Sequence, residues 1–211
     1  MDLNTFMEAV LKLDALKNPN NSNKLCQLFN ENIKLELVHD WLEKLNTQSD
    51  NDLINLASLM ENHPLGFKKF VIWESGTNGP RARIHHWPKN KWPKESIHDH
   101  RFHFCATVLC GYYTHEEYDV KHHQDGTVDL KLKNTTIISK GDSYFFPAGA
   151  FHRVIPSDET TTSLLVRGDA ILPYSRVIDP ETKKMRISYG SIKKFRENIK
   201  ELQFDLSSMK L

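Results

Sequence analysis

The first sixty residues place apolar side chains at three- and four-residue steps, the spacing of one face of an amphipathic helix. This pattern predicts three helices, at residues 3–17, 24–45 and 49–61. A break near residues 30–32 would divide the second helix, and Ser49 or Asp50 is the N-cap of the third. We therefore expect residues 1–62 to form a helical N-terminal segment that packs on the rest of the chain.

From residue 63 onward the pattern changes to short runs rich in β-branched and aromatic residues, separated by Gly, Pro, Asn and Asp. The runs predict strands at residues 67–73, 81–87, 103–113, 127–132, 136–138, 143–146, 153–155 and 160–166. Short strands at this spacing indicate a barrel or a sandwich. Residues 63–190 are expected to form one β-barrel domain, and residues 191–211 return to helical spacing as a C-terminal tail.

Composition and charge narrow the class of partner. The 211 residues, 39% of them hydrophobic, can bury the core of one domain plus an appendage. There are 28 basic and 27 acidic side chains, and the Lys-rich run at Lys193 and Lys194 alternates with Phe195 and Glu197, as on a solvated helix face. The sequence therefore predicts no nucleic-acid partner.

The cysteines and the N-terminus bear on the compartment. Cys26, Cys105 and Cys110 are too few and too irregularly spaced for a disulfide framework, and no CxxC pair is present to hold zinc. The N-terminus has neither a basic stretch nor a continuous apolar stretch, and no window approaches the roughly eighteen apolar residues of a membrane span. We expect a cytoplasmic protein with no membrane partner.

Three histidines carry the candidate chemistry. His98 and His100 are two residues apart, so on a strand both side chains point to one face and can reach one ion. His152 lies in a second segment punctuated by glycine and proline. In that segment Gly141 permits a tight turn, and Gly149 permits a positive φ in the turn that directs His152 inward. The sequence predicts a mononuclear metal site with these three ligands.

The two segments resemble the two signature motifs of the cupin superfamily. The matching residues are His98, His100 and Gly111 in the first motif, and Gly141, Pro147, Gly149 and His152 in the second, with every interval kept. Phe104 and Cys105 stand where the first motif has a glutamate, and Pro156 replaces the last asparagine. The resemblance implies a mainly β fold, a cupin β-barrel or jelly roll behind an N-terminal helical segment. It also implies a site of three histidines without a glutamate.

A narrower resemblance is to the thiol dioxygenases typified by cysteine dioxygenase. That family has a run similar to residues 96–100, has cysteine at the place of Cys105, and holds ferrous iron with three histidines. The resemblance implies Fe(II) as the cofactor and O2 as a co-substrate. Three imidazoles also suit Zn, Ni or Mn, which remain alternatives.

One motif of the thiol dioxygenases is missing. Where the family has Ser-x-His-x-Tyr, this chain has Leu165 and Arg167 in place of the histidine and the tyrosine, so no cross-link between Cys105 and that tyrosine can form. Arg167 could instead bind a substrate carboxylate, since guanidinium binds carboxylate through two hydrogen bonds. Tyr144 or His103 could move protons. The candidate catalytic residues are Arg167, Tyr144 and Cys105.

Strand parity refines these candidates. Phe104 should face inward, whereas His103 and Cys105 should face away from the site unless a bulge turns them. Four further cations are candidates for binding a carboxylate: Lys68, Lys69, Arg81 and Arg83. One residue of the pair His85 and His86 could line the pocket.

The pattern as a whole favours a non-haem Fe(II) dioxygenase that acts on a small carboxylate-bearing thiol or a related metabolite. The first alternative is a Zn, Ni or Mn cupin that works as a hydrolase, isomerase or lyase. The second is a non-catalytic cupin that binds a small ligand. Exposed edge strands favour a homodimer.

Overall fold

The computed structural model describes residues 1–62, 67–76, 79–89 and 96–190, with 195–196, 198–200 and 202–203 of the tail. The N-terminal segment is helical, as predicted. Its elements are α1 (Leu3–Lys12), a short 3-10 turn (Pro19–Asn21), α2 (Ser22–Asn32), α3 (Leu35–Asn46) and α4 (Asp50–Ser58). The chain does break after residue 32, and the Ser49 side chain caps α4 by accepting from the Asp52 amide.

Twelve strands among the described residues form two six-stranded sheets, and every pairing between these strands is antiparallel. The first sheet contains, in spatial order, β1 (Glu61–Asn62), β2 (Lys68–Glu74), β3 (Arg81–Trp87), β10 (Thr161–Arg167), β5 (Phe104–Cys110) and β8 (Ser143–Phe146). The second contains β12 (Met185–Tyr189), β11 (Tyr174–Ile178), β4 (Ile97–His98), β9 (Phe151–Pro156), β6 (Tyr112–His122) and β7 (Val128–Ser139).

The strand order identifies the architecture. The eight strands β3 to β10 form one half-barrel in the order β3-β10-β5-β8 and a facing half in the order β4-β9-β6-β7. This order, in which the chain crosses repeatedly between two facing sheets, is that of a double-sheet jelly roll. The predicted mainly β fold with an N-terminal helical segment is confirmed. Strands β1 and β2 extend one sheet, and β11 and β12 extend the other.

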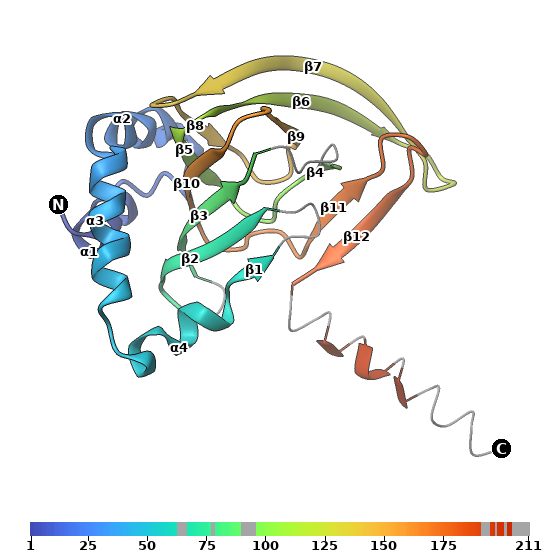
Figure 1. Ribbon diagram of the computed structural model, residues 1–211. Helices are drawn as coiled ribbons and strands as arrows, with labels where there is room; N and C mark the ends of the chain where they lie inside the picture. Colours follow the sequence, from blue (N-terminus) through green and yellow to red (C-terminus); the bar gives the residue numbers. More distant parts are fainter. Residues whose placement is uncertain are drawn as a thin grey trace.

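The helices cover the outer face of the first sheet (Figure 1). Phe6 and Phe29, which belong to the apolar faces of α1 and α2, are fully buried in one cluster with Ala82, Leu164 and Val166 from the sheet. Burying a large apolar side chain stabilises the fold by about 1.5–3 kcal/mol. The amphipathic helices therefore close this face, and the inner face of the sheet is left to line the barrel interior.

Several strand limits differ from the prediction. The run at residues 103–113 is two strands, because Gly111 turns the chain with a φ of 72°. A Cβ on Gly111 would lie 2.5 Å from the Thr160 carbonyl oxygen, so only glycine fits. The runs 127–132 and 136–138 are one strand, β7. The predicted runs did not include β1, β4, β11, β12 or the part of β6 beyond Tyr113.

The predicted helical tail lies largely outside the described residues, although the described residues of that tail are helical. Within the described part of the chain, no helix is both long enough and apolar enough to cross a membrane.

Candidate metal centre

Two neighbouring strands bring the three predicted ligands together. His98 is the last residue of β4 and pairs directly with His152 of β9, while His100 follows β4 by two residues. One ligand atom of each histidine lies within 4.8 Å of those of the other two. The Nε2 atoms of His100 and His152 are 2.8 Å apart, close to the roughly 3 Å that separates two nitrogens bound to one ion at about 2.1 Å.

Hydrogen bonds on the far nitrogens direct the ligands. His98 Nδ1 lies 2.9 Å from the Ser96 carbonyl oxygen, which can only accept, so Nδ1 carries the proton and Nε2 keeps its lone pair. His152 Nδ1 lies 2.7 Å from Nε2 of His115, a buried residue of β6. With the proton on His152 Nδ1, the Nε2 lone pair of His152 is likewise available to an ion.

Sequence reasoning missed His115. It lies two residues after Tyr113 on β6, so both side chains point to the same face of that strand. This parity was the only local signal, and it does not show that β6 lies beside β9.

Burial sets the protonation of the cluster. Burial and the neighbouring imidazoles lower the pKa of His100 and of His152 well below the ordinary value. Burial also lowers the pKa of His115 to about 4. These rings are therefore neutral at pH 7, and neutral imidazole is the form that binds metal ions.

The donor set fits a divalent transition metal. Three neutral nitrogens suit Fe(II), Zn, Ni or Mn, with positions left for other ligands. Phe104 stands beside the imidazoles instead of a carboxylate, with its ring centroid 5.0 Å from that of His100 and 6.0 Å from that of His152. The inward direction of Phe104 agrees with its predicted parity.

A cavity of about 340 Å³ opens above the histidines, near the small end of the range for ligand pockets. Three cationic side chains line it: Lys69, Arg83 and Arg186. Among the described lining residues, the one carboxylate belongs to Asp99, which is ion-paired with Arg176. The cavity is therefore biased toward anionic ligands.

Arg83 is the most distinctive of these cations. Its guanidinium is buried and lies over the Phe102 ring at 5.6 Å, and its Nε has no hydrogen-bond partner among the described residues. Burial lowers the pKa of Arg83 to about 10, so the group stays charged at neutral pH. A buried Nε–H without a hydrogen-bond partner is costly, and an anionic ligand that accepts from it would offset that cost.

The other predicted cations are arranged differently. Lys69 lines the cavity and forms an ion pair with Glu61. Arg81 pairs with Glu74 at 3.3 Å, and Lys68 is exposed. The exposed Arg186, which sequence reasoning missed, reaches the cavity from β12.

Tyr144, a predicted catalytic residue, lies in the cavity. Its hydroxyl accepts a hydrogen bond of 3.0 Å from the hydroxyl of Tyr113, and its ring centroid is 5.0 Å from that of His115. His85 also lines the cavity, whereas His86 contacts the Thr162 hydroxyl. The tyrosine pair is thus placed to donate or accept a proton near the histidines.

Cys105, the second predicted catalytic residue, lies elsewhere. It is fully buried on the opposite face of β5, against Cys26 and the helices. Burial raises the pKa of the Cys105 thiol well above its ordinary value. Cys105 therefore faces away from the site, as its position on the strand predicts, and no bulge turns its side chain inward. A direct catalytic role for Cys105 has no support in this arrangement.

Arg167, the third, lies behind the cavity wall. Its guanidinium lies over the Phe102 ring, 4.9 Å from the ring centroid, and donates to the Gly168 carbonyl oxygen at 2.9 Å. Leu165 lines the cavity, but Arg167 on the same strand does not. The predicted contact of Arg167 with substrate therefore has no support, and Arg83 is the arginine of the two that lines the cavity. His103 is a packing residue, whose Nδ1 accepts from the Ala148 amide.

The sequence matches no protein-family model and no curated protein. Solved structures resemble the chain weakly. KdgF from Halomonas sp. aligns at 14% identity and a TM-score of 0.36, over 52% of this chain and 86% of that protein. The DMSP lyase DddQ from Ruegeria pomeroyi aligns at 14% identity and a TM-score of 0.39, over 61% of this chain and 68% of that protein. A cupin superfamily protein from Desulfitobacterium hafniense aligns at 13% identity and a TM-score of 0.36, over 54% of this chain and 87% of that protein. The assignment of the fold therefore rests on the strand order, and the assignment of the candidate site rests on the geometry of its residues.

Proposed function

We propose that the chain is a mononuclear metal enzyme, a non-haem Fe(II) dioxygenase that acts on a small anionic thiol or a related metabolite. One observation carries the proposal. Three histidine side chains converge in a cavity that is also lined by Arg83, whose Nε atom is buried. The choice of iron is supported by the likeness of residues 96–100 to the thiol dioxygenases.

The reaction expected for a thiol substrate is RSH + O2 → RSO2⁻ + H⁺. Sulfur loses four electrons, dioxygen accepts them, and both oxygen atoms stay in the sulfinate. An iron held by His98, His100 and His152 would supply the one-electron chemistry that dioxygen needs.

The chain's own residues bind and orient the substrate. Arg83 would attract its anionic group, with Lys69, which is ion-paired with Glu61, as a second cation in the lining. The apolar side chains of Phe67, Trp87 and Phe104 exclude water from the inner cavity. The hydroxyl of Tyr144, held by that of Tyr113, can accept or return the proton that the substrate releases.

The alternative metals stay open for a specific reason. Three histidines without a carboxylate are also a catalytic zinc set, and Cys105, which packs against the helices and does not line the cavity, adds no support to the cysteine-dioxygenase comparison. A Zn, Ni or Mn hydrolase, isomerase or lyase is therefore the second candidate. The open cavity above the histidines also suits the other alternative, a non-catalytic cupin that binds a small ligand, and absence of turnover with every metal would favour it. A homodimer and a cytoplasmic location stay predictions.

The test begins with metal analysis of protein purified without added metal. The protein is then loaded with Fe(II) under anaerobic conditions and offered a panel of thiol acids in an oxygen electrode, with His152→Ala as the control variant. Oxygen uptake that needs thiol, Fe(II) and His152 supports the proposal. Stoichiometric zinc together with no thiol-stimulated uptake would favour the second candidate.

A further inference from the structure

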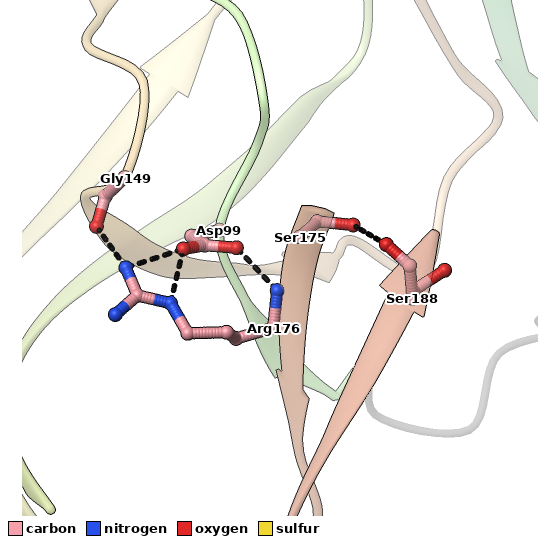
Figure 2. A network of polar contacts seen from close by, with 5 residues as sticks. All are labelled: Asp99, Gly149, Ser175, Arg176 and Ser188. Carbon is pink, nitrogen blue, oxygen red and sulfur yellow. Dashed lines mark hydrogen bonds and ion pairs between the residues drawn. The ribbon is translucent and has the colours of Figure 1, made fainter. Parts of the chain in front are cut away.

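Asp99 lies between the two ligands His98 and His100 and is buried, with 1% of its surface exposed. Arg176 of β11 binds it from the neighbouring strand (Figure 2). The Arg176 Nε donates to Asp99 Oδ2 at 2.6 Å, and the Arg176 amide donates to Oδ1. In return, the Asp99 amide donates to the Arg176 carbonyl oxygen at 3.0 Å. The segment that carries two of the ligands is thus bound to β11 by both backbone and side chain.

The same guanidinium reaches the segment that carries the third ligand. The Nη2 atom of Arg176 donates to the Gly149 carbonyl oxygen at 3.1 Å (Figure 2). Gly149 forms the turn just before β9 with a φ of 78°, and its amide donates to the His100 carbonyl oxygen at 3.0 Å. One side chain therefore contacts both segments that supply metal ligands.

The arrangement restricts the guanidinium further. It stands over the Phe151 ring at 4.5 Å, and Phe151 immediately precedes His152. A planar guanidinium can hold a carboxylate, a carbonyl oxygen and an aromatic face in fixed directions, whereas the single ammonium of lysine cannot. Arg176 is therefore suited to fixing geometry and not only to neutralising Asp99.

We propose that Arg176, through Asp99 and Gly149, is a positioning residue that holds the His98 and His100 segment in register with His152 and so sets metal affinity. The inference rests on the metal site of the proposed function. It assigns a role to the β11–β12 extension, which lies outside the eight strands of the jelly roll.

The test uses the full chain and the variant Arg176→Lys. Co(II) is titrated into metal-free protein, because its visible absorption reports both occupancy and ligand geometry. We expect Co(II) affinity to fall by about 10- to 100-fold, as for other residues that orient metal ligands, with a changed absorption spectrum. The matched control is Arg81→Lys, whose ion pair with Glu74 lies on the other sheet. It should bind Co(II) like the wild type.

A merely structural role would lower the stability of the metal-free protein and leave the affinity and spectrum of the folded fraction unchanged. That result for Arg176→Lys would overturn the inference. If this variant does not fold, Asp99→Asn is judged by the same criterion. Failure of the metal site itself is distinguishable, because then the wild type would not bind one Co(II) or His152→Ala would bind it equally well.

Discussion

His115 Nε2 lies 2.7 Å from His152 Nδ1, and both rings are buried. The contact joins β6 to β9, whose strands pair with His115 opposite Val154. In the proposed metal site His152 would present its Nε2 to the ion, so His115 would accept the proton of Nδ1 and fix the tautomer of His152. His115 would then influence the metal without being one of its ligands.

Replacing His115 with leucine should weaken metal binding by about 10- to 100-fold, because the Nδ1 proton of His152 loses its acceptor. The buried unpaired donor should also cost about 1–3 kcal/mol of stability. Metal titration and urea unfolding of the metal-free protein measure the two effects. His115→Gln, which can still offer an oxygen acceptor, should recover part of the affinity. Equal binding by wild type and both variants would contradict the role.

The guanidinium of Arg83 should serve ligand binding at the expense of stability. Arg83→Met removes a buried charge whose Nε has no described hydrogen-bond partner, so unfolding by urea should show a stability that is unchanged or higher by about 1 kcal/mol. Oxygen uptake with a thiol acid should lose most of its kcat/KM, while the thiol alcohol of the same length should be affected far less. A stability loss with equal effects on both substrates would show that Arg83 is a structural residue.

The fold and the convergence of the three histidines could be predicted because their signals are local. The spacing of His98 and His100 and the positive φ of Gly149 depend on residues close in sequence. The contacts of His115 and Arg176 could not, since both form between strands whose pairing is set by distant segments. Local parity alone could not show that Arg83 lines the cavity and Arg167 does not. Arg167 lies on the same face of β10 as Leu165, and only Leu165 reaches the cavity.

Cys105 should be an inert thiol. Burial raises its pKa, so its thiolate fraction stays low even at pH 9, where an ordinary cysteine is largely ionised. Mass spectrometry after iodoacetamide treatment should find Cys105 unmodified in the native protein and modified in urea, with the partly exposed Cys110 as the internal control. Cys105→Ala should keep oxygen uptake within about twofold, because the thiol does not line the cavity. A large loss of uptake by a folded variant would restore the catalytic role expected from the sequence.

Removal of the bound metal should lower the thermal stability of the protein, and this effect should depend on the three histidines of the candidate site. A ligand that binds only the folded state adds about 2.7 kcal/mol when its free concentration is a hundred times its Kd, so a chelator should lower the Tm of metal-loaded protein measurably. His152→Ala should show no such drop, because its loss leaves two of the three nitrogens gathered at the site. His39→Ala is the matched control, since His39 lies in an exposed cluster on α3 with Asp40 and Glu43. It should respond to the chelator like the wild type, and if it lost the response instead, the stabilising ion would be bound at α3 and not in the barrel.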